Sequence, residues 1–559
     1  MKPVQALSRF LSDSATRRTL TAAAISSVAA VLLPAMYRLW GIPLLADAYN
    51  GRSVAFLNRI VATRKDHPLE EYYSWAESVL GELVFVLAAL SLVLLCVAIY
   101  AYFVAAKREH TRYVNRLDAV VFVLGLSAST LMVFWFEGAY YESDINTFVE
   151  WQISLNDSLA NIYLACPSCN YPFLGTLLSA GVFQVIKAVS PTLDFETYAQ
   201  LFQYLLSFID AINVLFAYFV IRALGIPRSL FWAGLIGLLP SSWAGSAVWG
   251  QIDGITQFFI LAFLLWQLAF LAGHDRRPFR ISPGLYVAGS SFFLACLLLT
   301  KQLALFSVPV LACMTLAILY LRARNNFLAL SSALAVLVAI GIVLPDVFLN
   351  VEAGYLSHLH YILAGGGSAH GDKISGNGFN IWMLLGRDMW SSSSEPFVGS
   401  LTPKAAGVFL FLAYEIILFG TALRWFGKRL ANLPTVPHKE LFLTFVFLLA
   451  LTNLSFNVLI TGTHERYLYH FYPYMLIAYL GFRQTAARSK LLPAAILFGS
   501  VFYGRFVWGV LRPEAANIPH ELVAAFHLWL LVFLTIVFMR QTLPSVGNRD
   551  HLAGEVRTS

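Results

Sequence analysis

Uninterrupted apolar runs of about 20 residues recur along the chain and are separated by short polar linkers. A helix of that length crosses the hydrocarbon core of a bilayer. Lipid offers no partners to backbone N–H and C=O groups, so membrane spans are helices or closed barrels, and runs that do not alternate exclude a barrel. The pattern therefore predicts an all-α polytopic membrane protein. Its runs lie near residues 20–40, 78–106, 118–136, 200–222, 229–246, 252–273, 283–300, 303–321, 327–349, 406–425, 441–460, 467–483, 491–510 and 522–540.

Basic linkers between the runs predict how the chain is oriented. Short linkers rich in Lys and Arg stay on the cytoplasmic side. They can all do so only if residues 137–199 lie wholly outside, so that the apolar run at 173–190 is re-entrant or interfacial and does not cross. This arrangement gives about 14 spans with both termini in the cytoplasm. The linkers concerned are 107–116, 222–228, 274–280, 322–324, 424–429 and 483–490.

Composition agrees with a membrane protein. The 559 residues are 58% hydrophobic and 12% charged, whereas an ordinary soluble domain is about 25% charged. The net charge of +7 is assigned to cytoplasmic loops, and no nucleic-acid partner is predicted. The basic N-terminus lacks the usual cleavage site and is interpreted as a cytosolic leader, not as a signal peptide.

Five cysteines are too few for a disulfide framework. Cys166 and Cys169 form a lone CxxC pair, which cannot make a structural zinc site. They form either a disulfide that stiffens the loop in an oxidising compartment or two free thiols. No metal site is predicted anywhere in the chain.

Polar motifs gather in the segments predicted to face outward. These segments are the ones that the charge pattern leaves outside, and several independent motifs on one face indicate an extracytoplasmic site. One of them, 350–405, is rich in Gly and Ser and is either a mobile lid or disordered filler. The segments are 41–77, 137–199, 246–254, 300–302, 350–405, 461–467 and 511–520.

The first large outer loop offers carboxylates just beyond a span. Asp144, in YYESDINTF, is a candidate general base towards a hydroxyl nucleophile, with Glu142 in reserve. The alternative is that acids here only mark the edge of the membrane. Tyr171, in CNYPF, is a candidate sugar-binding ring or a simple interfacial anchor.

Two further motifs place polar groups between apolar runs. Trp249, Gln251 and Asp253, in WGQID, can bind sugar hydroxyls or the backbone of neighbouring helices. Lys301 is a lone cation whose outward position opposes the charge bias. Either it binds a phosphate at the outer surface, or its side chain snorkels to the interface.

The motif THERY at 463–467 is the most specific of the set. Arg466 is suited to bidentate binding of a phosphate, and His464 can donate to a phosphate oxygen. Glu465 can contact an acceptor or simply pair with Arg466. The spacing does not match a zinc-binding HExxH motif.

Taken together, these motifs resemble the integral-membrane glycosyltransferases of the GT-C superfamily. The closest resemblance is to bacterial mannosyltransferases related to the second mannosyltransferase of glycosylphosphatidylinositol synthesis, and to similar enzymes that use polyprenyl-phosphate sugars. The motifs follow the family's order and are ESDINTFVEW (142–151), CNYPF (169–173), AVWGQID (247–253), LTKQ (299–302) and THERYLY (463–469).

The resemblance implies a GT-C-like fold and an inverting hexosyltransferase. A sugar, with mannose favoured, moves from a polyprenyl-phosphate donor to a hydroxyl of a lipid or glycan acceptor on the extracytoplasmic side. Asp144 or Glu142 is then the base, and no cofactor or divalent metal is required. The implied donor-phosphate ligands are Lys301, Arg466 and His464. The implied sugar or acceptor ligands are Tyr171, Trp249, Gln251, Asp253 and Glu465.

Expected localisation is a bacterial inner membrane with the site facing the periplasm, or an endoplasmic-reticulum membrane with a lumenal site. The expected parts are 1–117 with a leader and two extra spans, a core at 118–349 with its catalytic loop at 137–199, the loop 350–405, and the spans and tail of 406–559. Two other functions stay open. One is a transporter or flippase of lipid-linked sugars, for which Asp210 inside an apolar run is the main indication. The other is a surface-glycan polymerase or ligase.

Overall fold

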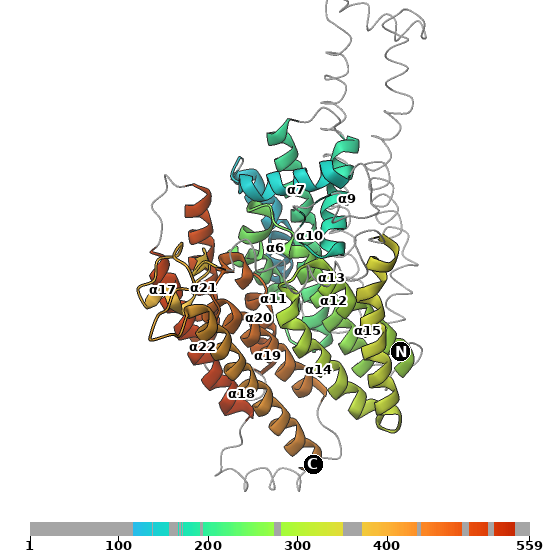
Figure 1. The fold of residues 1–559 in the computed structure, drawn as a ribbon. Helices are drawn as coiled ribbons and strands as arrows, with labels where there is room; N and C mark the ends of the chain where they lie inside the picture. The colour runs from blue at the N-terminus through green and yellow to red at the C-terminus, as the bar shows by residue number, and fades with distance from the viewer. Residues whose placement is uncertain are drawn as a thin grey trace, which may run out of the picture. The chain divides into compact units, whose positions relative to one another are not determined.

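The structure is a computed structural model that is mostly helical (Figure 1). It divides into two compact units, Met1–Val123 with Ala180–Phe202, and Leu124–Ser179 with Gln203–Ser559. All candidate site residues belong to the second unit. The two spans predicted at 20–40 and 78–106 lie outside the described residues. Those residues are 116–136, 138–155, 166, 169, 171–189, 194–272, 281–349, 372–432, 438–482, 491–512 and 519–542.

Ten helices in the described part of the chain are long and apolar enough to cross a membrane, which confirms the all-α membrane class. Each corresponds to one of the predicted apolar runs. The helices are α6 (Arg116–Trp135), α10 (Phe195–Ala223), α12 (Asp253–Ala272), α13 (Pro283–Thr300), α14 (Ala304–Arg322), α15 (Phe327–Leu349), α18 (Pro403–Asn432), α19 (His438–Leu459), α21 (Leu491–Leu511) and α22 (His520–Thr542).

Shorter elements connect these helices. They are α7 (Glu142–Leu155), α9 (Phe173–Val189), α11 (Ser229–Leu238), η2 (Pro240–Ser242), η3 (Ala244–Val248), η4 (Arg324–Asn326), β1 (Ser375–Gly376), α17 (Ile381–Leu384), β2 (Thr463–His464), η6 (Glu465–Leu468) and α20 (Phe471–Phe482). The first outer loop thus contains a helix of its own, α7. The apolar helix α9 is shorter than the ten spans, and its re-entrant or interfacial placement stays a prediction.

The span expected at 229–246 is wrong in its length. Helix α11 stops at Leu238, and Leu239 takes an extended conformation with ψ 128°. Pro240 accounts for this break, because a proline disfavours the helical conformation of the residue before it and cannot donate a helical hydrogen bond. A 3₁₀ turn and the π-helical segment η3 follow in place of α-helix.

The span expected at 467–483 is also shorter than predicted. The 12-residue helix α20 begins only at Phe471, after the 3₁₀ turn η6. Pro473 lies in its first turn, where the missing N–H has no intrahelical partner to lose. The chain between β2 and α20 is therefore free to form the compact turn on which Arg466 lies.

Residues 372–402 are folded, so the disordered alternative for the loop 350–405 is wrong over this part. Ile374, Trp382, Met383 and Ala406 form a small buried cluster. The indole of Trp382 donates to the carbonyl of Leu459 at the end of α19. Residues 350–371 lie outside the described residues.

Helix α19 forms the centre of the second unit. It packs against α14, α18, α20 and α22, as Figure 1 shows, and its residues from Leu441 to Leu459 are all buried. By contrast, α15 packs mainly on α13 and leaves large side chains such as Leu328 and Ile340 exposed. Exposed apolar side chains on a helix of this length suit contact with lipid.

Glycines bring α6 and α11 into backbone contact. A Cβ built on Gly125 would lie 2.3 Å from the carbonyl oxygen of Gly234, and one on Gly237 would lie 2.3 Å from that of Gly125. Small residues at such crossings let membrane helices approach closely. The crossing fixes the end of α11, and hence the start of the irregular segment beyond it.

We predict that Gly125→Ala destabilises the protein by about 1–3 kcal/mol, because the added methyl meets backbone that cannot rotate away. Gly420→Ala in α18 is the matched control, since nothing lies within 4 Å of its added Cβ. Replacing a helical glycine where there is space stabilises by about 0.5–1 kcal/mol. Thermal unfolding in detergent measures both variants, and equal midpoints would contradict the close crossing.

Candidate functional site

Asp144 lies in the first turn of α7 and is held by an indole from a distant segment. Trp249 Nε1 donates to Asp144 Oδ2 at 2.6 Å. The ring of Tyr141 stacks on that of Trp249 with centroids 4.5 Å apart, and the Tyr141 N–H donates to the Trp249 carbonyl. The side chain of Asp144 is 19% exposed, so it is fixed in place but open to a small reactant.

Arg466 is the centre of the charged group around Asp144. Its Nη1 lies 3.9 Å from Asp144 Oδ2, 3.4 Å from Glu465 Oε1 and 3.2 Å from His464 Nδ1. The guanidinium also lies over the Trp249 ring, 5.8 Å from its centroid. We call Asp144, Trp249, His464, Glu465 and Arg466 the Arg466 cluster.

A second group forms around Lys301, at the C-terminal end of α13. Lys301 Nζ donates to Asp253 Oδ1 at 2.8 Å and to Gln251 Oε1 at 3.4 Å. The hydroxyl of Tyr171 donates to the same Gln251 oxygen at 3.0 Å, and Lys301 Nζ lies 5.1 Å from the Tyr171 ring centroid. Lys301 is only 3% exposed, so the snorkelling alternative is wrong. We call these four residues the Lys301 cluster.

The segment 249–253 joins the two clusters. Trp249 belongs to the first cluster, whereas Gln251 and Asp253 belong to the second. Between them Gly250 adopts a φ of 88°, and a Cβ there would lie 2.8 Å from the side chain of Ile145. Only glycine tolerates both the positive φ and the close approach of Ile145 at low cost. Gly250 of the WGQID motif therefore lets the chain turn from one cluster to the other.

Aromatic rings border the Lys301 cluster on the side of α7. The ring of Tyr171 makes edge contacts with Trp151 and Phe148, with centroids 5.0 and 6.1 Å apart. The hydroxyl of Tyr171 donates to Gln251, so both the ring and the hydroxyl of Tyr171 are held in place.

Residues that the sequence did not single out hold these segments together. Gln203 in α10 donates from Nε2 to the carbonyls of Ala139 and Val248, at 2.9 and 2.7 Å. It therefore ties the chain before α7 to the chain before Trp249. A Gln inside the apolar run 200–222 is the sequence signal that could have pointed to it.

Asp210 is explained by packing within the second unit. It accepts from Ser129 Oγ on α6 and from the Tyr469 hydroxyl, both at 2.8 Å. Tyr469 lies three residues after Arg466, so this bond anchors the turn that carries the Arg466 cluster. Asp210 therefore bonds a neighbouring span, α6.

A short parallel strand pair supports the histidine side of the site. Ser375 and Gly376 of β1 pair with Thr463 and His464 of β2. A Cβ on Gly376 would lie 2.6 Å from the His464 ring. Asn457 in α19 donates to the His464 carbonyl at 2.7 Å. The folded part of the long loop therefore fixes the backbone that presents His464.

The reserve base Glu142 is not part of the clusters. It is exposed at the first residue of α7 and, among the described residues, makes no ion pair. The open question about the cysteines is answered by the disulfide between Cys166 and Cys169. The described part of the chain contains no group of three His, Cys, Asp or Glu side chains that could hold a metal ion.

The two clusters together contain three carboxylates and two permanent cations. Burial raises the pKa of Glu465 to about 7, against the opposing effect of Arg466. Its Oε2, the Nε of Arg466 and the Oδ2 of Asp253 are buried and have no hydrogen-bond partner among the described residues. Buried polar atoms are rarely left without partners. These three atoms therefore mark where a ligand would find both donors and acceptors.

Chemically, the arrangement offers a fixed, accessible carboxylate within 4 Å of a guanidinium. It can accept a proton at one end and bind an anion at the other. No protein-family model matches this chain, and no curated protein matches its sequence.

We predict that Glu465 makes stability depend on pH. An unfolded glutamate titrates near pH 4.3, and Glu465 in the fold titrates at about 7. Its contribution is therefore complete below the unfolded pKa and is lost as pH rises through about 7. The free energy of unfolding of the wild type, followed by thermal unfolding, should fall more between pH 5 and pH 8 than that of Glu465→Gln, by roughly the few kcal/mol that a shift of this size represents.

The control for this measurement is Glu395→Gln. Glu395 is 61% exposed in its pair with Arg387, so its replacement should leave the pH slope of the wild type unchanged. Identical slopes in the wild type and Glu465→Gln would show that Glu465 does not titrate in this window.

Proposed function

We propose that the protein is an inverting membrane glycosyltransferase. It moves a hexose, with mannose favoured, from a polyprenyl-phosphate donor to a hydroxyl of a lipid or glycan acceptor. The observation that supports this most directly is the Arg466 cluster. It combines a partly exposed carboxylate, fixed by Trp249, with a buried guanidinium whose Nε–H lacks an acceptor among the described residues.

Asp144 acts as the general base. It accepts the proton of the acceptor hydroxyl as the oxygen forms its bond to the anomeric carbon. The bond from that carbon to the phosphate oxygen breaks, and its electron pair leaves with the polyprenyl phosphate. A single displacement of this kind inverts the anomeric configuration. The Trp249 hydrogen bond leaves Asp144 Oδ1 as the oxygen that is free to face the acceptor.

Arg466 stabilises the phosphate as it leaves with an additional negative charge. Its Nε–H is buried and has no acceptor among the described residues, so it is the donor of Arg466 that a phosphate oxygen would satisfy. His464, which is next to Arg466 Nη1, supplies the second group of the phosphate site. Lys301 has a carboxylate partner in Asp253, so it adds positive potential and positions Gln251.

Polar atoms at the Lys301 cluster fit the sugar. Gln251 and Asp253 present acceptors, and Asp253 Oδ2 has no partner among the described residues. Tyr171 contributes an aromatic edge beside them. A transporter is less well supported, because Asp210, the charge that suggested it, has Ser129 and Tyr469 as partners.

We predict that Asp144→Asn lowers transfer by about 10²–10⁴-fold, the usual contribution of a general base. The amide keeps the shape of the side chain but cannot take up the proton. The assay offers radiolabelled polyprenyl-phosphate mannose, and then other polyprenyl-phosphate sugars, to protein in nanodiscs with membrane lipid extract as acceptor.

Glu142→Gln is the matched control for Asp144→Asn and should retain activity, because Glu142 is exposed outside the clusters. Loss of transfer in the Glu142 variant alone would move the base to that residue. If the wild type binds a donor but transfers sugar from none of the donors offered, the transporter is favoured.

We predict that Arg466→Lys lowers the transfer rate by about 10²–10³-fold, as is usual for removing one donor to a developing anion. A lysine keeps the charge but cannot present the planar fork of donors. Lys404→Gln, which removes an exposed cation paired with Asp372, is the control. Unchanged transfer by Arg466→Lys would remove the guanidinium from the phosphate site.

A further inference from the structure

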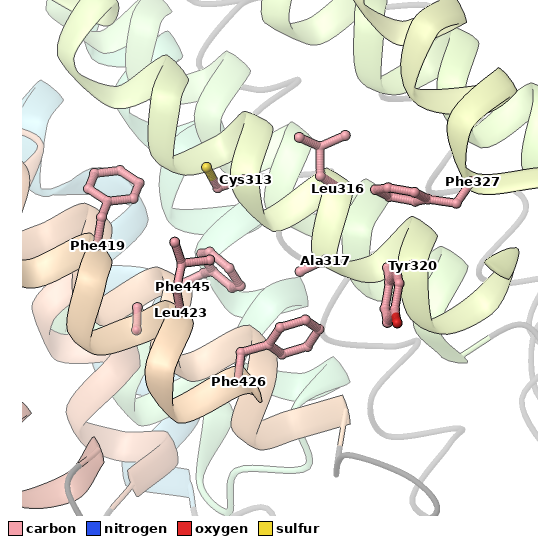
Figure 2. A pocket seen from close by; sticks show the side chains of 10 residues that line it. Cys313, Leu316, Ala317, Tyr320, Phe327, Phe419, Leu423, Phe426 and Phe445 are labelled. Carbon is pink, nitrogen blue, oxygen red and sulfur yellow. The ribbon is translucent and has the colours of Figure 1, made fainter. Parts of the chain in front are cut away.

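An apolar cavity of about 270 Å³ lies among α14, α15, α18 and α19 (Figure 2). Apolar and aromatic side chains make up almost all of its wall. Ala317 contributes only a methyl group, which leaves room in the middle of the wall formed by α14. The lining residues are Cys313, Leu316, Ala317, Tyr320, Phe327, Phe419, Ala422, Leu423, Phe426 and Phe445.

Three aromatic rings define one end of the cavity. Tyr320 lies between Phe327 and Phe426, with centroid distances of 5.4 and 6.5 Å. Arg324 lies over the Tyr320 ring, 5.5 Å from its centroid, and is exposed. At this end of the cavity, a cation therefore lies directly next to the apolar rings.

Arg322, two residues before Arg324, is held differently. Its Nη2 bonds the Leu271 carbonyl and approaches His438 Nε2 at 2.7 Å, so it fastens α14 to its neighbours. Arg324 is thus the cation available to a ligand at this end. Both residues belong to the basic linker at 322–324, which the charge pattern places on the cytoplasmic side.

The cavity opens towards the lipid-facing surface of α18. Leu423 lines it and is also 60% exposed. Water does not fill such a space stably, because a buried water needs two to four polar partners and the Tyr320 hydroxyl is the principal polar group of the lining. A flexible hydrocarbon chain that enters from the bilayer satisfies both the shape and the chemistry.

We propose that the cavity binds an acyl chain of an anionic phospholipid from the cytoplasmic leaflet, with Arg324 pairing with the phosphate of its headgroup. Phosphatidylcholine would also fill the cavity, but its choline cation offsets the charge of its phosphate, so Arg324 pairs less strongly with it than with a headgroup of net negative charge. Basic side chains next to membrane helices attract anionic headgroups in this way. The proposal does not depend on glycosyl transfer.

The test uses photo-crosslinking in nanodiscs of phosphatidylcholine. The probe is phosphatidylglycerol with a diazirine on its acyl chain, compared with phosphatidylcholine carrying the same group. We expect phosphatidylglycerol to label peptides containing Leu316, Leu423 or Phe426 several-fold more than phosphatidylcholine does. We expect Ala317→Phe, which fills the cavity, to reduce that labelling several-fold.

Matched variants separate the cavity from general contact with lipid. Ala335→Phe adds the same ring on the exposed side of α15, outside the cavity, and should leave labelling unchanged. Arg324→Gln should bring labelling by phosphatidylglycerol down to that by phosphatidylcholine. Arg424→Gln removes an exposed cation of α18 that does not line the cavity, and it should leave labelling by phosphatidylglycerol unchanged. If Ala317→Phe does not fold, Leu423→Trp fills the mouth from the lipid side.

Three outcomes would overturn the proposal. Labelling that is uniform along α15 and α18, and that Ala317→Phe does not change, would mean that lipid only surrounds the helices. Equal labelling by the two phospholipids in the wild type would remove the headgroup contact with Arg324. Preferential labelling of the same peptides by a diazirine-bearing polyprenyl phosphate would make a carrier lipid the occupant.

Discussion

A buried guanidinium must be surrounded by acceptors, and much of the second unit is arranged to meet this requirement for Arg466. Removing a charge from water costs several kcal/mol unless partners replace the water. Arg466 finds these partners in Asp144, His464 and Glu465, with the face of Trp249 beside them. They come from the start of α7, the turn before α20 and the irregular segment before α12. The positions of these three segments are therefore coupled through one side chain.

The irregular segment between α11 and α12 is what makes this meeting possible. The chain leaves the α-helical path at Leu239, and Trp249, near the end of the irregular segment, bonds Asp144. Pro240 ends the helix early, and the segment that follows stays inside the protein, where its backbone groups find partners. Gln203 supplies one of these partners by bonding the Val248 carbonyl. The break in the helix and the position of the site are therefore parts of the same feature.

The membrane class and most of the long helices were predictable from the sequence, because a run of 20 apolar residues in lipid has few alternatives to a helix. The end of α11 before Pro240 was not, because a proline in an apolar run either ends a helix or stays within it, as Pro309 does in α14. The candidate residues of the site were found from their predicted position on the outer side. Their pairing was not predictable, because Lys301 and Asp253 are 48 residues apart and only the packing of α12 on α13 brings them together.

Unpartnered buried donors and acceptors distinguish a ligand-binding site from a network of buried ions that is already satisfied. In a complete network of buried ions every donor and acceptor has a partner, and loss of one partner is costly. Neither cluster meets that condition. Lys301 Nζ has both Asp253 and Gln251, but Asp253 Oδ2 has no partner among the described residues. In the Arg466 cluster the guanidinium keeps an Nε–H without an acceptor beside two carboxylates, and burial raises the pKa of one of them, Glu465, to about 7. With Glu465 protonated, Arg466 faces only one carboxylate charge. An anion bound at Arg466 would then meet a cation that is partly uncompensated, so uptake of a proton at Glu465 and binding of an anion at Arg466 would favour each other.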